Sequence, residues 1–195
     1  MKQRNDFVSN SSSSSFIVVK GDKCETYNFN NQEIQIPNPE GHIEFGWSWE
    51  KFNDFWSKLN FCAIQLVDLK DLKHRISDIE RDPVKRIENK DWLKRYAENM
   101  KPECDKWDHY FEMLQNVCKK RFNLNIELNE KIGFGDGELF AYIDHQSSVL
   151  EGDNMEMFDS ETDLYHFLAS PESFIKTGND NDTPPDPLWY DDKYN

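Results

Sequence analysis

Two short polar groups in the C-terminal half of the chain contain residue types that can do chemistry. The first is Asp144-His145, which follows the apolar run 139–143. Histidine titrates near neutral pH and binds metals, so His145 is a candidate general base or metal ligand, with Asp144 as a second ligand. Adjacent strand residues point to opposite faces, so both reach one site only if the chain turns there. A structural, hydrogen-bonded histidine is the alternative that the sequence favours.

The second polar group follows Thr177 and Gly178 and contains Asn179, Asp180 and Asp182. Carboxylate and amide oxygens at alternating positions are the ligands of calcium loops, which makes these three residues candidate metal ligands. The full calcium-loop pattern, with its closing glutamate, is absent. An Asn/Asp-rich turn is therefore the favoured interpretation.

A run of five serines, residues 11–15, precedes the apolar stretch 16–19 near the N-terminus. Hydroxyl groups and backbone N–H groups can bind phosphate, so Ser11, Ser12, Ser13 and Ser14 are candidate ligand-binding residues. Serines alone are typical of a linker, because their hydroxyls compete for backbone hydrogen bonds. The β-branched and aromatic run that follows them favours an ordered first strand instead.

The same N-terminal stretch carries a resemblance. Residues 4–16, RNDFVSNSSSSSF, resemble the signature R-x-D-F-V-[ST]-N-S-S-S-S-S-F of a group of uncharacterised proteins from Firmicutes and their phages. No activity is assigned to that group, so the resemblance implies no catalytic residue. It implies that the serines are a constrained part of the protein.

The last residues combine prolines, aromatics and acids. We divide the chain into one domain, 1–182, and an acidic C-terminal tail, 183–195. The tail offers aromatic and carboxylate side chains that can dock onto its own domain or onto another protein. The candidate partner-binding residues are Asp186, Trp189, Tyr190, Asp191 and Asp192.

The charge is distributed unevenly. The net charge is −14, and residues 125–195 contain 17 acidic and 3 basic residues, which also amounts to −14. Residues 1–69 (9 acidic, 6 basic) and 70–124 (11 acidic, 14 basic) cancel each other. Such a surface repels nucleic acid and complements a basic protein, although acidic segments often serve solubility alone.

Strand signals lie at both ends of the chain. The pattern predicts strands over 16–19, 23–31 and 42–46, with a polar surface loop between the last two. Residues 124–128 and 139–143, separated by the glycine-rich stretch 133–137, predict a β-hairpin.

Helix signals lie between and after these strands. Ser48 is a candidate N-cap for helical segments over 49–76, which Asp82-Pro83 ends, although 62–67 also suits a strand. Apolar residues at helical spacing predict a helix over 102–121, and Ser160 is the expected cap of a short helix. We therefore predict a single α+β domain whose antiparallel sheet, including the hairpin, is covered by two or more helices.

The four cysteines are scattered and form no zinc-ligand pattern, so we expect reduced thiols. The sequence shows no signal-peptide pattern and no apolar run of membrane-spanning length. We expect a cytoplasmic protein with no cofactor, no membrane contact and no direct nucleic-acid binding.

Three function classes follow. The first is a protein-binding or regulatory protein of bacterial or phage origin that engages a basic partner, in its sharper form an inhibitor or nucleic-acid mimic. The second is a metal-dependent hydrolase or nucleotide-processing enzyme centred on His145. The third is a structural subunit of a larger assembly. Charge and the absence of a convincing catalytic set favour the first class, and the sequence leaves open whether the protein is an enzyme.

Overall fold

The longest described helix is α1 (Phe55–Arg81), with 27 residues. We describe a computed structural model covering residues 13–21, 23–46, 48–81, 99–129, 141–143 and 155–179. Asp54 caps α1, since its Oδ1 accepts a hydrogen bond from the Ser57 backbone N–H at 2.9 Å. The prediction of Ser48 as the cap, with a helix from residue 49, is wrong because residues 50–52 form a strand. The helix is continuous through 62–67, which excludes the alternative of a strand there, and joins the predicted helical segments into one; it is described as far as Arg81, and Asp82 and Pro83 lie outside the described residues.

The second long helix is α4 (Trp107–Phe122), and it confirms the sequence periodicity. Its buried residues include Tyr110, Leu114 and Cys118. Asn123, in the left-handed conformation with φ of 54°, ends the helix. Residues 99–105 are also helical, so Pro102 lies within a preceding helical segment and not at the start of α4.

The remaining elements are short. They are β1 (Ser13–Val18), β2 (Gln32–Ile36), β3 (Glu44–Phe45), β4 (Glu50–Phe52), β5 (Leu124–Leu128), β6 (Tyr142–Ile143), the 3₁₀ helix η1 (Glu156–Phe158), α5 (Glu161–Ala169) and β7 (Phe174–Asn179). Ser160 caps α5, as predicted, by accepting a hydrogen bond from the Asp163 N–H at 3.0 Å. The expected ordered first strand is confirmed as β1.

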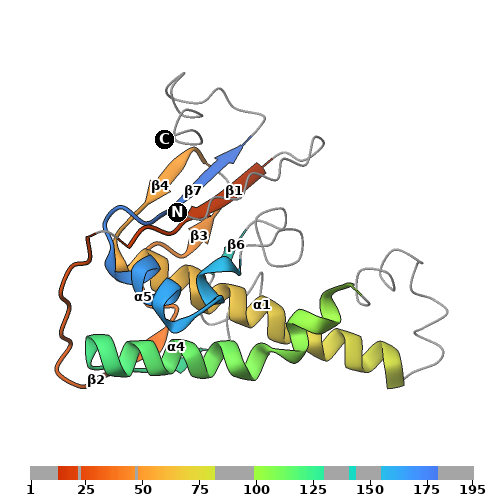
Figure 1. Ribbon diagram of the computed structural model, residues 1–195. Coiled ribbons are helices and arrows are strands. Elements are labelled where there is room, and N and C mark those ends of the chain that lie inside the picture. The colour runs from red at the N-terminus through yellow and green to blue at the C-terminus, as the bar shows by residue number, and fades with distance from the viewer. Residues whose placement is uncertain are drawn as a thin grey trace.

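An antiparallel sheet of three strands stands above the helices in Figure 1, in the order β1-β7-β4. The strand β7 runs between β1 and β4 and pairs with both. Ile17 of β1 and Phe52 of β4 each lie opposite Ile175 of β7 in the register. All three side chains pack on the hydrophobic core. The protein is a mixed α+β domain with an antiparallel sheet, which confirms the predicted fold class.

The predicted hairpin over 124–143 is wrong. Instead, β5 pairs in parallel with β2, and β6 pairs in parallel with β3. Parallel pairing needs a long crossover, and α1 and α4 lie between β2 and β5 in the chain. The glycine-rich stretch 133–137 lies outside the described residues.

The predicted strand over 23–31 is also wrong. Asn30 and Asn31 have φ values of 52° and 63°, and the Gln32 N–H donates to the Phe29 carbonyl at 2.9 Å. This turn sets the start of β2, so the strand occupies the segment that the sequence assigned to a surface loop. Tyr27 and Phe29 nevertheless pack against the core.

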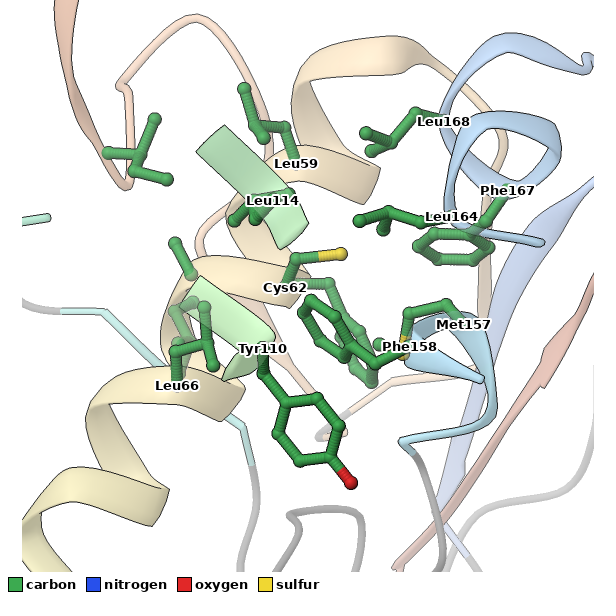
Figure 2. Close-up of a cluster of buried hydrophobic side chains, with 14 of the residues drawn as sticks. Leu59, Cys62, Leu66, Tyr110, Leu114, Met157, Phe158, Leu164, Phe167 and Leu168 are labelled. Carbon is green, nitrogen blue, oxygen red and sulfur yellow. The ribbon is translucent and has the colours of Figure 1, made fainter. Parts of the chain in front are cut away.

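The core lies between the helices (Figure 2). Leu59, Cys62 and Leu66 of α1 gather with Tyr110 and Leu114 of α4, with η1 and α5 closing the cluster. Cys62, Cys104 and Cys118 are buried free thiols, and Cys24 is a half-buried one. None of the described helices combines the length and the apolar character needed to cross a membrane.

Candidate functional site

The strand register brings two of the predicted groups to one end of the three-stranded sheet. Ser13 lies opposite Asn179, and Ser14 lies opposite Gly178. The serine tract therefore enters the sheet where β7 ends and the C-terminal segment begins. We call this region, formed by Ser13, Ser14, Ser48, Trp49, Gly178 and Asn179, the polar end of the sheet.

The residues before β4 hold the polar end in place. Thr177 is 2% exposed, and its Oγ1 donates a hydrogen bond to the Ser48 carbonyl oxygen at 2.7 Å. On the next residue, a Cβ atom at Gly178 would lie 2.4 Å from Cζ3 of the Trp49 ring. Only glycine lets the indole approach the backbone this closely. The Thr177 hydrogen bond and the Trp49 ring contact thus add to the strand pairing that holds the end of β7.

One face of the sheet carries positive charge. Side chains alternate along a strand, so Val18, Lys51, Phe174 and Lys176 lie on the face opposite Ile17 and Ile175. We call it the outer face. The Lys51 ammonium lies 3.9 Å from the centre of the Phe174 ring, a cation–π contact. Lys176 is 1% exposed, which is rare for a lysine.

The predicted metal group is divided by the structure. Thr177, Gly178 and Asn179 belong to β7, so the first half of the group 177–182, for which the sequence favours an Asn/Asp-rich turn, is strand, and residues 180–182 lie outside the described residues. The residues pair with β1, and an extended strand cannot wrap an ion as a calcium loop does. Asp180 and Asp182 lie outside the described residues.

The other predicted sites are placed only in part. Ser13 and Ser14 lie in β1, whereas Ser11 and Ser12 lie outside the described residues. Asp144 and His145 also lie outside them, directly after β6. The tail residues that remain outside the described part of the chain are Asp186, Trp189, Tyr190, Asp191 and Asp192.

A buried lysine is a feature that sequence reasoning missed. Lys58 of α1 is 1% exposed, and its Nζ donates a hydrogen bond to the Ser170 carbonyl oxygen at 2.8 Å. Burial lowers the pKa of Lys58 to about 8, while Asp54 and Glu25 oppose this shift. Ser170 follows the last residue of α5, where a cation stabilises the helix dipole. With so little exposed surface, Lys58 serves the packing of α5 on α1.

A histidine that the sequence did not single out lies beside the sheet. The His42 ring stacks on Phe52 with centroids 4.3 Å apart. Its Nε2 lies 3.8 Å from Glu50 Oε2 and also contacts the Glu44 carbonyl oxygen. Since that ring nitrogen already has a backbone partner, His42 links β3 to β4 and is a structural histidine.

A carboxylate on α1 has an unusual environment. Burial raises the pKa of Asp68 to about 7, with a further contribution from Asp71, while Arg75 opposes the shift. Because an ionised, half-buried carboxylate costs folding free energy, Asp68 lowers the stability of the fold at neutral and higher pH.

Within the described ranges, no group of three or more His, Cys, Asp or Glu side chains is placed to hold a metal ion. Comparison of the chain with family models, with curated proteins and with solved structures found no match. The polar end of the sheet and the outer face are therefore interpreted from their own chemistry.

Proposed function

We propose that this is a protein-binding or regulatory protein of bacterial or phage origin that engages a basic protein surface through its acidic C-terminal third. The register of β1 against β7 carries the proposal. Asn179, the last described residue before the acidic C-terminal residues, lies opposite Ser13 on a paired, central strand, which offers the tail a fixed attachment point. A fixed attachment point lowers the entropy cost of binding.

The charge distribution supports the same function. Residues 125–195 have a net charge of −14 from 17 acidic and 3 basic residues. A field of one sign speeds the approach of an oppositely charged partner. The tail aromatics Trp189 and Tyr190 supply the large side chains that dominate the energy of many interfaces. An inhibitor that presents carboxylates in place of nucleic-acid phosphates is a specific form of this proposal.

Affinity capture from a lysate of the native host tests the proposal. The tagged full chain is compared with the triple variant Asp186→Asn, Asp191→Asn, Asp192→Asn, which removes charge and keeps side-chain size. A matched control replaces three exposed helical carboxylates: Asp71→Asn, Asp78→Asn, Glu112→Gln. Retained proteins are quantified by mass spectrometry.

We expect the full chain and the control to retain the same basic protein in near-stoichiometric amount. The tail variant should retain at least tenfold less of it. Equal retention by the tail variant and the control variant would contradict the proposal, as would capture of no basic protein by the full chain.

A further inference from the structure

An irregular segment, residues 23–31, covers the start of α1, and we call it the strap. It lies between β1 and β2 in the chain and runs along one edge of the molecule (Figure 1). At its end, the Asn31 N–H donates to the Asn123 carbonyl oxygen at 2.7 Å. Most side chains of the strap are exposed, and the half-buried ones are Cys24, Tyr27 and Phe29. The strap therefore buries little surface of its own.

Backbone hydrogen bonds fasten the strap to the ends of two helices. The Glu25 N–H donates to the carbonyl oxygen of Ala169, the last residue of α5, at 2.9 Å. The Phe29 N–H donates to the carbonyl oxygen of Phe122, the last residue of α4, also at 2.9 Å. The last carbonyls of a helix lack partners within the helix, so the strap supplies donors that these helix ends need.

The buried amine of Lys58 lies beside the first of these hydrogen bonds. Ala169, which accepts from the strap, is followed by Ser170, whose carbonyl oxygen accepts from Lys58 Nζ at 2.8 Å. Cys24 and Glu25 of the strap are close enough to act on the Lys58 ammonium electrostatically. The strap therefore contributes to the burial that leaves Lys58 1% exposed.

The two aromatic rings of the strap cover the adjacent turn of α1. The centroids of the Tyr27 and Phe29 rings lie 4.8 Å and 5.1 Å from that of Phe55. Phe55 is 3% exposed and precedes Lys58 by three residues, a spacing that places both on one side of the helix. One continuous segment thus covers both the Phe55 ring and the Lys58 amine.

We propose that the strap is a cover that opens as one unit while the helical layer stays folded, and that its opening exposes the amine of Lys58. A segment with few buried contacts opens at a lower free energy than the core does. The strap binds the ends of α4 and α5, so its release breaks no hydrogen bond within either helix. The Lys58 amine can react with other molecules only in the open form. This site is separate from the acidic tail, so the proposal goes beyond the proposed function.

Two rates measured on the full chain test this proposal. Amide exchange followed by NMR compares the N–H groups of Glu25 and Phe29 with that of Leu114 in α4. Acetylation by N-acetoxysuccinimide, followed by peptide mass spectrometry, measures access to the Lys58 amine. Lys106, which is exposed, gives the acetylation rate of a lysine without a cover.

Three variants change the strap to different extents. Phe29→Ala removes a ring that packs on α1. Tyr27→Phe is milder and removes only the hydroxyl that donates to the Glu25 carboxylate. Thr26→Ala, at an exposed position of the strap, is the matched control. Exchange at Leu114 reports whether each variant keeps the helical layer folded.

We expect the strap N–H groups to exchange at least about 100-fold faster than that of Leu114, since local opening costs less free energy than global unfolding. Phe29→Ala should raise both strap exchange and Lys58 acetylation at least about tenfold, and Tyr27→Phe should raise both about threefold. Thr26→Ala should change either rate by less than about twofold.

Strap exchange at the Leu114 rate overturns the proposal, because the strap then opens only when the whole domain unfolds. Acetylation of Lys58 in the parent chain as fast as that of Lys106 also overturns it. So does Lys58 acetylation that stays constant while strap exchange rises, since the amine is then reached by another route. None of these outcomes depends on whether a basic partner is captured.

Discussion

The helical layer and the three-stranded sheet both bury polar residues, but they differ in how much apolar area surrounds those residues. Around Leu59, Cys62 and Leu114 the core is apolar and shared by α1, α4 and α5, although α1 also buries the polar residues Ser57, Lys58, Asn60 and Gln65. The sheet buries Lys176 and Thr177 on its central strand, and Ser170 and Ser173 are buried just before that strand. The helical layer supplies the apolar area that stabilises the fold, whereas the sheet places polar groups at a fixed end. Substitutions in the two regions should therefore have different consequences.

Leu114→Ala should have the largest effect on stability. Leu114 is fully buried between α1 and α5, so its truncation leaves a cavity. We expect the free energy of unfolding to fall by about 2–5 kcal/mol, measured by chemical denaturation. Glu112→Ala, on the exposed face of the same helix, is the control and should change it by less than about 0.5 kcal/mol. Similar losses for the two variants would show that the helical layer is not the main source of stability.

Gly178→Ala should destabilise the three-stranded sheet at the end of β7. A Cβ there meets the Trp49 ring at 2.4 Å, and we expect a loss of about 1–3 kcal/mol from overpacking. Denaturation followed by tryptophan fluorescence measures it. In a double-mutant cycle, Gly178→Ala should lower the free energy of unfolding much less in the Trp49→Ala background than in the parent chain, because the indole ring that the new Cβ would contact is absent. Additive losses would show that the ring contact does not fix the end of β7.

Asp68→Asn should change the pH dependence of stability in the helical layer. Because the folded pKa of Asp68 is about 7 and its ordinary value is 3.8, the folded chain binds a proton more tightly between these values. The contribution that protonated Asp68 makes to the free energy of unfolding is therefore fully present below about pH 4 and is lost as the pH rises through about 7. Asn carries no charge, so this loss should disappear, with a gain of about 1–2 kcal/mol at pH 8.

Thermal unfolding between pH 4 and pH 8 measures this effect. Asp78→Asn, at an exposed position of the same helix, is the control. If both variants keep the slope of the parent chain, burial of Asp68 does not govern it.

Ser160→Ala should have the smallest effect. It removes the hydroxyl that accepts from the Asp163 N–H at the start of α5. We expect a loss of about 1 kcal/mol in unfolding free energy, since one terminal N–H loses its partner. Thr162→Ala, exposed in the first turn of the same helix, is the control. A loss as large as that of Leu114→Ala would contradict the view that apolar contacts hold the helical layer together.

The same comparison explains which parts of the fold the sequence predicted. The helices 107–122 and 161–169 follow from local signals, namely apolar spacing and the Ser160 cap. The strand β1 follows from a β-branched run. The sheet pairings join distant segments, as where Ser13 meets Asn179, and no local pattern encodes such a contact.

The central strand β7 shows why the candidate site was found only in part. Its sequence, Phe-Ile-Lys-Thr-Gly-Asn, carries a lysine and a glycine, and the Asn and Asp residues that follow favour a turn. The alternation of Ile175 and Thr177 against Phe174 and Lys176 is the signal that indicates a strand. Lys58 was missed for another reason: its burial depends on the Ser170 carbonyl, which packing brings to α1 from a distant part of the chain.

The most direct test of the proposed function is the salt dependence of association between the purified chain and the basic protein that it captures. Association rates are measured by surface plasmon resonance at about 0.05 M and 0.5 M salt, where charge screening differs strongly. We predict that the rate for the full chain falls at least tenfold, and that the variant with Asn at 186, 191 and 192 shows a smaller fall. An identical salt dependence for the two chains would contradict the claim that the acidic tail engages the partner.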